Sequence, residues 1–467
     1  MLTLGKKKNL NNRGNYTEGP ILAPLLSIGF SLLLSGLLEK TYHLADNIII
    51  GKFSGDPYAI GAIGSTGPAV TLLTSVIFGL AVGSNVIIAR KYGAKDYKAV
   101  SDTIHSSVLF SAIAGFIIAI LGSTLCVPLL ELLGTKAEFM EGARNYLSIY
   151  FWGVPFSAVF NYASGGLRGT GNQSAPTTIL FISGIINVFL NLIFVVTLGL
   201  GTGGVALATV ISQIFSAVAV LWVLMRGDER FPFRFSLLRI DGAILRGMLV
   251  IGIPVCIQNS LSSITSFVTS QARNTLSAEA VTSYSITMTI LSFTGVAITA
   301  FTVTPIIAFV GQNWGANNFA RVKRCLILSS LSTVVLFALI ATPQILFSDF
   351  LAGMFMESGS VGEEQIKLLV GQMLTIMLFG YFISGFDYIF ISFLRATGRS
   401  VIPMLISVFS TTVLCCFWCW FVFPLPAMNN PIGYVIMNPL SAFISTLLKL
   451  ANAIIVFKKE KLKSTPI

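Results

Sequence analysis

The sequence predicts an all-α integral membrane protein with twelve transmembrane helices in two six-helix lobes. Three observations support this class: the composition is strongly apolar, twelve long hydrophobic segments follow one another, and basic residues gather in alternate connections. Hydrophobic residues make up 54% of the 467 residues and charged residues only 10%, whereas a soluble domain carries about 25% charged residues. A chain with so few polar residues cannot cover the surface of a water-facing globule.

A helix needs about 20 apolar residues to cross the hydrocarbon core of a bilayer. Segments of this kind in the first half of the chain are residues 21–51, 57–88, 99–125, 142–166, 176–198 and 204–225. Those in the second half are residues 243–271, 280–310, 325–347, 364–393, 401–423 and 432–456. The connections are short, so we expect no sizeable soluble domain. The polar tail leads into a long apolar helix with no small-residue cleavage site, so we do not expect a removed signal peptide.

Lysines and arginines are divided unevenly between the two predicted sides of the membrane. With the N-terminus inside, most of them fall on the inner side, for example Arg90 and Lys91 after the second segment and Lys458 and Lys459 after the last. Basic connections are cytoplasmic in membrane proteins, so both termini are predicted to be cytoplasmic. The net charge of +11 is therefore a sign of topology, and we expect no nucleic-acid partner, which would need a basic soluble face.

Two short motifs occur twice in the same order. Leu167-Arg168-Gly169-Thr170-Gly171 returns as Leu394-Arg395-Ala396-Thr397-Gly398, an offset of 395 − 168 = 227 residues. Tyr92-Gly93-Ala94 returns as Trp314-Gly315-Ala316, an offset of 315 − 93 = 222 residues. Because six spans restore the starting side of the membrane, the two halves should share one orientation. They are then related by a pseudo-two-fold axis along the membrane normal.

The repeat divides the chain into two predicted lobes. We expect a cytoplasmic tail at residues 1–19, an N-lobe with helices 1–6 at 20–226, a cytoplasmic linker at 227–241, a C-lobe with helices 7–12 at 242–457 and a second cytoplasmic tail at 458–467. Two such bundles leave a cleft between them, which is the usual place for a transported substrate. A duplicated membrane scaffold without transport is the alternative interpretation.

Several motifs, taken in order, resemble one family. They are Gly19-Pro20-Ile21, Tyr42 with Asp46, Gly51, Gly93-Ala94, Leu167-Arg168-Gly169-x-Gly171, Asn187, residues 204–209, Gln312-Asn313-x-Gly315-Ala316 and Leu394-Arg395-Ala396-x-Gly398. Together they resemble the multidrug and toxic compound extrusion (MATE) transporters of the bacterial type. The resemblance implies two lobes in a V shape that alternate between inward and outward openings. It also implies a secondary active antiporter of the cell membrane that exports small amphipathic or cationic organic compounds in exchange for H⁺ or Na⁺.

Three acidic residues lie well inside apolar segments: Glu39, Asp46 and Asp387. A carboxylate there is unfavourable by several kcal/mol unless it is paired or protonated, so each is a candidate for function. Asp46 is the strongest candidate, because a carboxyl group in apolar surroundings titrates nearer to neutrality. Such a group can take up a proton on one side of the membrane and release it on the other. The alternative is a carboxylate held by fixed hydrogen bonds at the outer interface.

The resemblance implies partners for Asp46. In relatives, an Asp on helix 1 meets an Asn and an Asp four residues apart on helix 5 and a Thr on helix 6. The matching ion-coupling positions here are Asp46, Asn187, Asn191 and Thr209, and these would be the metal ligands if Na⁺ is the coupling ion. Asn191 stands where many relatives have Asp, which weakens a Na⁺ site because hard cations favour anionic oxygen ligands. The two asparagines could equally join helices as polar contacts.

Glu39, Tyr42, His43 and Asp46 form one polar stripe, since their spacing follows the helical period. We predict that Glu39, Tyr42 and His43 bind substrate, with Glu39 contacting a cationic group or relaying protons. The competing interpretation is an internal Glu39–Lys40 ion pair, because a buried charge normally has a partner. A single histidine in a helix is also often a hydrogen-bonded packing residue.

Asp387, Gln258 and Tyr284 are the predicted substrate contacts of the second half. Some relatives carry an acidic residue in the helix of Asp387, but about one turn away, so the correspondence is inexact. The neighbouring Tyr381 and Tyr388 could supply aromatic walls for a cation. They could equally be ordinary lipid-facing residues.

Other classes of protein are less consistent with the sequence. It contains no His-Glu-x-x-His, no Gly-x-Ser-x-Gly and no phosphate-binding loop, so we expect no enzyme, no cofactor and export driven by an ion gradient. The six cysteines show no disulfide framework and are interpreted as packing residues. The alternative function is a flippase for lipid-linked oligosaccharide precursors, although only Lys40 and Lys449 could line a basic cavity. We expect a monomer in the lipid bilayer.

Overall fold

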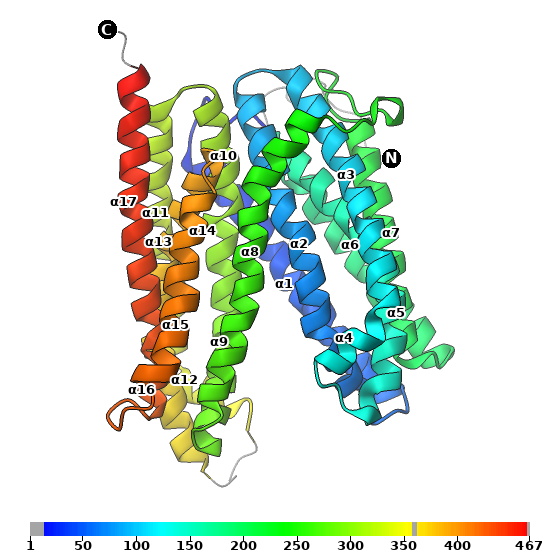
Figure 1. Cartoon of the computed structure of the whole chain (residues 1–467), viewed down its shortest axis with the longest axis vertical. Coiled ribbons are helices and arrows are strands. Elements are labelled where there is room, and N and C mark those ends of the chain that lie inside the picture. The colour runs from blue at the N-terminus through cyan, green and yellow to red at the C-terminus, as the bar shows by residue number, and fades with distance from the viewer. Residues whose placement is uncertain (1–13, 357–361, 465–467) are drawn as a thin grey trace. The chain divides into compact units, whose positions relative to one another are not determined.

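A computed structural model describes residues 14–356 and 362–464 of the chain (Figure 1). All regular secondary structure in this part is helical, as predicted. The remainder of the two predicted tails, residues 1–13 and 465–467, lies outside the described residues. The positions of the six cysteines also agree with the sequence analysis, because all six are free thiols and only Cys416 is not fully buried.

Six long helical segments precede the predicted linker. The elements of this half are α1 (Leu22–Phe53), α2 (Ala59–Gly93), α3 (Tyr97–Thr124), α4 (Cys126–Leu132), α5 (Ala137–Gly169), α6 (Ser174–Asn191), the π-helical η2 (Leu192–Thr197) and α7 (Gly201–Met225). A short 3-10 helix, η3 (Phe235–Leu237), lies in the linker.

Six long segments follow the linker. The elements are α8 (Gly242–Arg273), α9 (Ala278–Thr302), α10 (Thr304–Gly315), α11 (Phe319–Leu346), α12 (Ser348–Gly353), α13 (Glu363–Ala396), α14 (Val401–Ser407), η4 (Val408–Val413), α15 (Leu414–Phe417), η5 (Trp418–Val422), α16 (Pro431–Val435) and α17 (Met437–Ser464). Within the described ranges, 10 helical stretches are long and apolar enough to cross a membrane. The 35-residue α2 and the 33-residue α5 complete the twelve predicted spans.

The chain packs into two compact units. Of the described residues, unit 1 contains 14–19, 34–256 and 311–316, and unit 2 contains 20–33, 257–310, 317–356 and 362–464. The predicted lobes were continuous in sequence, whereas the chain changes unit inside α1, α8 and α10. The predicted lobe boundaries follow the sequence repeat. Each packing unit also includes short stretches from the other predicted lobe.

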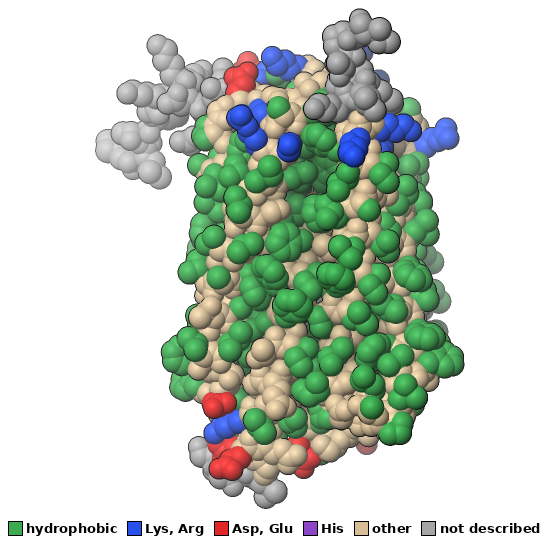
Figure 2. All heavy atoms as spheres, turned by 90° about the vertical axis from the view of Figure 1, so that its left-hand side faces the viewer, with side chains coloured by type: hydrophobic (Ala, Val, Ile, Leu, Met, Phe, Trp, Pro, Cys, Tyr) green, Lys and Arg blue, Asp and Glu red, His purple; other side chains and the backbone are tan. Residues whose placement is uncertain are grey.

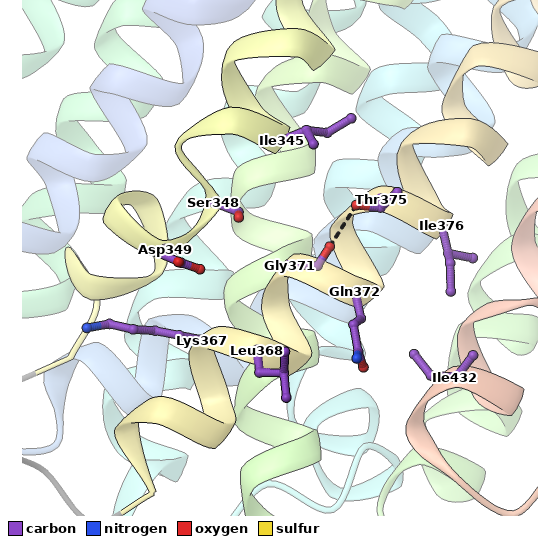
Figure 3. A pocket seen from close by; sticks show the side chains of 10 residues that line it. All are labelled: Ile345, Ser348, Asp349, Lys367, Leu368, Gly371, Gln372, Thr375, Ile376 and Ile432. Carbon is purple, nitrogen blue, oxygen red and sulfur yellow. Dashed lines mark hydrogen bonds between the residues drawn. The ribbon is translucent and has the colours of Figure 1, made fainter.

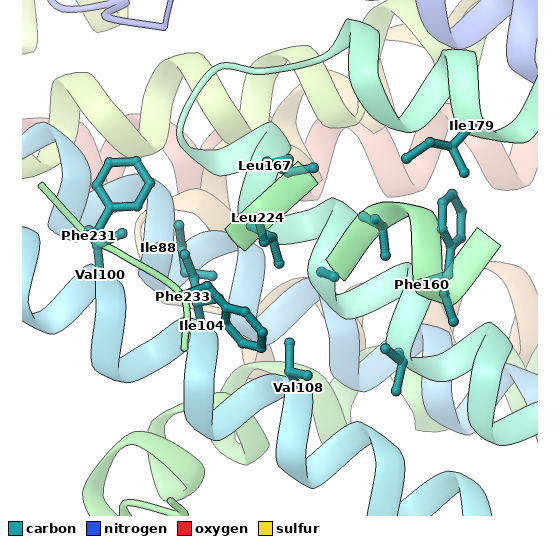
Figure 4. Close-up of a cluster of buried hydrophobic side chains, with 14 of the residues drawn as sticks. Ile88, Val100, Ile104, Val108, Phe160, Leu167, Ile179, Leu224, Phe231 and Phe233 are labelled. Atoms are coloured by element: carbon teal, nitrogen blue, oxygen red, sulfur yellow. The ribbon is translucent and has the colours of Figure 1, made fainter. Parts of the chain in front are cut away.

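In unit 1 the central helix is α5, which packs against α2, α3 and α7. A buried apolar cluster joins these helices to the linker (Figure 4). Phe231 and Phe233 of the linker are 9% and 3% exposed and insert their rings among Val100 and Ile104 of α3 and their neighbours. The His105 ring stacks on Phe233 at 4.9 Å between centroids. The predicted linker is thus anchored to α3 by side-chain packing.

In unit 2 the central helix is α13, which packs against α9, α11 and α17. The face drawn in Figure 2 shows a broad hydrophobic band, with Lys and Arg at one end and mainly Asp and Glu at the other. On α11, Leu331, Val335 and Leu339 are 58%, 59% and 69% exposed along one helical stripe. Side chains this apolar are exposed where lipid, and not water, is the solvent.

The repeated motifs produce the same turn in both halves. After α2, Lys95 has a φ of 60° and Asp96 caps α3 with a 3.1 Å side-chain hydrogen bond to its first turn. After α10, Asn317 has a φ of 56° and Asn318 caps α11 with a 3.3 Å bond of the same kind. The offset 317 − 95 = 222 equals that of the sequence motif. The repeat therefore includes a residue in the left-handed backbone conformation and a helix N-cap. Neither feature is evident from the motif sequences, because the residue types differ between the two halves.

The residues just before α1 pack inside unit 1. The Tyr16 N–H donates to Gln312 Oε1 at 2.9 Å, and Asn313 Nδ2 donates to the Tyr16 carbonyl at 3.0 Å. Gln312 Nε2 also donates to the Gly169 carbonyl at 2.9 Å. Burial raises the pKa of Tyr16 to about 12. Two of the family-like motifs and the end of the predicted tail thus meet in one buried hydrogen-bonded junction.

Two glycines permit the approach of α10 to α2 at this junction. A Cβ on Gly93 would lie 1.9 Å from the Gln312 carbonyl oxygen, and one on Gly315 would lie 2.0 Å from the Arg90 carbonyl oxygen. Neither contact can relax by moving a flexible side chain, because backbone atoms are on both sides. The Gly-Ala motif of each half is therefore required by close backbone packing.

Candidate functional site

The four predicted ion-coupling residues lie together in unit 1. Asn191 Nδ2 donates to Asp46 Oδ1 at 2.5 Å and to Asn187 Oδ1 at 3.3 Å. Asn187 Nδ2 lies 3.4 Å from Thr209 Oγ1, to which it donates, and Thr209 Oγ1 donates in turn to the Val205 carbonyl at 2.9 Å. The site therefore joins α1, α6 and α7 by a chain of side-chain hydrogen bonds that begins at one carboxylate.

The asparagines of this site are removed from solvent. Asn191 is 0% exposed and Asn187 is 6% exposed, while Asp46 and Thr209 are half-buried. Asn191 Oδ1 is buried and accepts no hydrogen bond from the part of the chain that the structure describes. The site thus offers carboxylate, amide and hydroxyl oxygens, which are the donors that a proton or a hard cation prefers.

Close packing of α1 on α6 positions Asp46. The Tyr42 ring occupies the space beside Gly184, where a Cβ would lie 1.8 Å from the ring. The Tyr42 hydroxyl donates to the Phe181 carbonyl at 3.1 Å. Asp46 is one helical turn beyond Tyr42, and Asn191 is two turns beyond Gly184, so the same contact brings carboxylate and amide together. Tyr42, predicted as a substrate residue, also serves as a structural contact.

Tyr146 of α5 is a neighbour of the site that sequence analysis did not identify. The charge of Asp46 acts on Tyr146, whose ring stacks on that of Tyr150 at 5.7 Å between centroids. The signal in the sequence was two tyrosines at i and i+4 within an apolar segment. Two hydroxyls on one helical face indicate a polar surface, but nothing local showed that this face meets α1.

The remaining stripe residues of α1 have different surroundings. Glu39 and Lys40 are both exposed, and neither forms an ion pair with any residue described. The charge of Glu39 acts on Tyr150 and on Arg168. The internal Glu39–Lys40 pair is therefore absent from this part of the structure, and the carboxylate stays available. The His43 side chain lies outside the described residues.

The three substrate residues predicted in the second half lie in three separate contacts of unit 2. Asp387 Oδ2 pairs with Lys449 Nζ at 2.7 Å. Gln258 Oε1 accepts a 2.8 Å hydrogen bond from Arg395 Nη2.

Tyr284 makes the third contact. Its ring meets that of Tyr434 at 5.3 Å and carries the Arg273 guanidinium 5.0 Å above it. The charge of Asp387 acts on Arg395, the donor to Gln258, so the first two contacts are linked, and no described hydrogen bond connects them to Tyr284.

Unit 2 has a surface pocket of 660 Å³ beside α12 and the start of α13 (Figure 3). Asp349, Lys367 and Gln372 are among its lining residues, and Lys367 pairs with Glu363 on the same helix. None of the predicted site residues lines it. The pocket is separate from the ionisable groups inside the apolar segments.

Comparison with known proteins places these features in a family. The MatE family model matches residues 32–193 and 252–421. The "Probable multidrug resistance protein YoeA" of Bacillus subtilis is 27% identical over 388 residues, covering 81% of this chain and 82% of that protein. The "Multidrug export protein MepA" of Staphylococcus haemolyticus is 25% identical over 403 residues, covering 85% of this chain and 86% of that protein.

Solved structures show the same fold. A multidrug resistance MATE family transporter of the MOP superfamily, in an outward-facing conformation, superimposes with a TM-score of 0.85 and 22% identity over 96% of this chain and 99% of that one. A MOP superfamily transporter from Pyrococcus furiosus superimposes with a TM-score of 0.87 and 20% identity over 97% of this chain and 99% of that one.

Proposed function

Because the chain belongs to the MatE family, we propose that it is a secondary active antiporter that exports small amphipathic or cationic organic compounds in exchange for H⁺ or Na⁺ by alternating access. The observation that carries this proposal is the hydrogen-bonded site of Asp46, Asn191, Asn187 and Thr209. A carboxylate beside amide and hydroxyl oxygens in an apolar helix is a set of donors that a proton or Na⁺ can bind.

The nature of the substrate follows from the relatives and from α1. Two bacterial relatives are named as multidrug resistance or multidrug export proteins, which supports a broad class of organic substrates. Glu39 is exposed on the same stripe of α1, which supports its contact with a cationic group of the substrate. We assign no cofactor, and we propose a monomer in the cell membrane.

The charge distribution supports an orientation. Basic side chains lie at one end of the hydrophobic band in Figure 2 and acidic ones mainly at the other. We place the basic end in the cytoplasm, because positive connections stay on that side of a membrane. Both termini are then cytoplasmic.

The coupling step requires Asp46 to bind its ion and the substrate in turn. With a proton or Na⁺ bound, the Asp46 carboxylate is neutralised and the Asn191 amide still donates to it. Loss of the ion restores the negative charge, which attracts a cationic substrate to the same helix. Exchange follows if the two forms of the site favour opposite openings of the transporter, because a ligand shifts a two-state equilibrium only by its difference in affinity for the two states.

The test is efflux of ethidium from cells that express the wild-type chain or Asp46→Asn, with pH and Na⁺ gradients varied separately. We expect gradient-driven efflux from the wild type and its loss in the variant. The gradient that drives efflux identifies the coupling ion. Glu364→Gln is the matched control, since Glu364 is an exposed carboxylate in the first turn of α13.

Two outcomes would change the proposal. Efflux that survives Asp46→Asn would move coupling away from the α1–α6–α7 site. Wild-type cells that export no member of a varied compound panel would instead support a lipid-linked oligosaccharide substrate, the flippase alternative.

A further inference from the structure

Unit 2 holds a buried ion pair whose lysine has no part in the function proposed above. Lys449 on α17 is 1% exposed, and its Nζ lies 2.7 Å from Oδ2 of Asp387 on α13. The Asp387 side chain keeps 14% of its surface exposed. Burying two charges is unfavourable unless the remaining donors and acceptors are also satisfied.

The pair is only partly satisfied. Asp387 Oδ1 is buried and accepts no hydrogen bond from the described chain. The Lys449 ammonium has three N–H donors, and the described acceptor that they reach is Asp387 Oδ2. One turn before Lys449, the Ser445 hydroxyl is also buried without a described partner. Half-satisfied polar groups are costly in apolar surroundings, so this carboxylate has an open position for a second positive group.

The packing of α17 on α13 sets the geometry of the pair. Gly380 allows a close approach, because a Cβ there would lie 3.1 Å from the Pro439 nitrogen. Further along both helices, Thr446 Oγ1 donates to the Ile383 carbonyl at 3.3 Å. The ion pair is the third contact on this line, one turn beyond Ile383. The backbone therefore holds Lys449 opposite Asp387.

Few charged groups act on the ion pair. The groups whose charges act on Lys449 are Asp387 and Arg395, both on α13. Arg395 is itself held by Gln258 of α8 at 2.8 Å. The elements α14 and η4 carry no ionisable side chain. The acidic or basic residues of α9, α11 and α12, which also pack on α13, lie in the first two turns of those helices, namely Glu279 on α9, Arg321, Lys323 and Arg324 on α11, and Asp349 on α12.

Aromatic residues precede and follow Asp387 along α13. Phe386 precedes Asp387, and its ring meets that of Phe382 edge-on at 5.2 Å between centroids. Tyr388 follows Asp387, and both aromatic neighbours are half-buried. Aromatic residues on this part of α13 are suited to an organic cation, because ring faces attract positive charge and tolerate apolar groups.

We propose that Lys449 is a tethered coupling cation, which competes with the exported organic cation for the Asp387 carboxylate. When the organic cation binds Asp387, the contact between Lys449 Nζ and Asp387 Oδ2 breaks. The displaced ammonium is then buried without a counter-charge and gives its proton to water, leaving a neutral amine. One cation is bound and one proton is released, so charge balances. This inference rests on the proposed export function and adds a second exchange site to the one at Asp46.

The test is binding of tetraphenylphosphonium to the purified full-length protein over a range of pH. An Asp46→Asn background removes the proton held at the first site. In that background we expect the affinity to rise about tenfold per pH unit, with one proton released per cation bound. Adding Lys449→Met should tighten binding at low pH and abolish both the pH slope and the proton release.

Two further variants keep the result interpretable. Lys458→Met makes the same change at an exposed position of the same helix and should leave the slope intact. Lys449→Arg keeps the ion pair but cannot release its proton, so we expect weak binding without a pH slope. An unchanged slope in Lys449→Met or Lys449→Arg would overturn the inference. If the wild-type protein binds no organic cation at all, the result contradicts the proposed export of organic cations, and the inference that depends on it is then also wrong.

Discussion

Each unit of the molecule holds a carboxylate to which we assign ion or cation exchange, Asp46 in unit 1 and Asp387 in unit 2, but the two are surrounded differently. In unit 1, Asp46 accepts a hydrogen bond from the neutral Asn191 amide. In unit 2, Asp387 contacts the Lys449 ammonium. The Asn191 amide brings no charge to Asp46, whereas Lys449 brings a full positive charge to Asp387. The duplicated helices share a scaffold without sharing its chemistry.

The sequence repeat shows which positions in one half correspond to the polar residues of the other half. Shifted by 227 residues, Asp387 corresponds to Phe160, since 387 − 227 = 160, and Phe160 is a buried member of the apolar cluster in Figure 4. The same shift places Leu414 and Trp418 at the positions of Asn187 and Asn191. Polar groups thus occupy different helix pairs in the two halves, which allows each half a separate role in the exchange.

The largest expected effect is on stability at Asp387. Asp387→Asn leaves the buried Lys449 ammonium without its counter-charge, and breaking a buried pair in this way costs about 3–5 kcal/mol. Asp46→Asn, the same substitution in unit 1, should cost less than Asp387→Asn, because the new amide oxygen can still accept from Asn191. The measurement is unfolding of the purified proteins in detergent.

A double variant separates charge from packing at this position. Lys449→Met in the Asp387→Asn protein removes the orphaned ammonium and should recover most of the lost stability. Equal losses in Asp387→Asn and Asp46→Asn, or no recovery in the double variant, would contradict the distinction between the two sites.

An intermediate effect is expected when the amide partner of Asp46 is removed. Asn191→Ala deletes the donor to a charged carboxylate, and a hydrogen bond to a charged group contributes about 1.5–3 kcal/mol. Asn187→Ala, the control, loses bonds between neutral groups and should cost about 1 kcal/mol. The free energies of unfolding are compared at neutral pH.

The same comparison can be made in unit 2. Gln258→Ala removes the acceptor for the Arg395 guanidinium and should resemble Asn191→Ala, since a charged group again loses its partner. If Asn187→Ala proves as costly as Asn191→Ala, the Asp46 carboxylate is not the charged centre of its site.

The smallest expected effect concerns the two equivalent helix caps, of which only one can titrate. The hydrogen bond from the Ala99 backbone, followed by the Lys91 side chain, lowers the pKa of Asp96. Its contribution is therefore present above the ordinary carboxyl pKa and is lost as the pH falls through the lowered value. Asp96→Ala should cost about 1 kcal/mol at neutral pH and less below about pH 4.

The matched substitution in the other half is Asn318→Ala. It should cost a similar amount, about 1 kcal/mol, at every pH, because an amide cap does not ionise. Unfolding measured at pH 3 and pH 7 for both variants tests this contrast. A pH-dependent loss for Asn318→Ala would show that the two caps differ in more than charge.

Features that depend on neighbours along the chain could be predicted from the sequence. Twelve apolar segments predict the spans, because a lipid-facing helix needs only length and hydrophobicity. The repeated Gly-Ala motifs predict matching helix ends, and Asn187 and Asn191, four residues apart, predict one polar face. The site around Asp46 was also predicted, but through resemblance to a family, since no local pattern joins residue 46 to residues 187 and 209.

Contacts between distant side chains became known from the packing of the helices. Lys449 and Asp387 are 62 residues apart, and each looked like an isolated charge in an apolar segment until α17 packed on α13. Tyr16 met Gln312 across 296 residues, and the chain changed packing unit inside α1, α8 and α10. Hydrophobic periodicity specifies that a helix has a buried face, but the partner of that face depends on close packing among many elements at once.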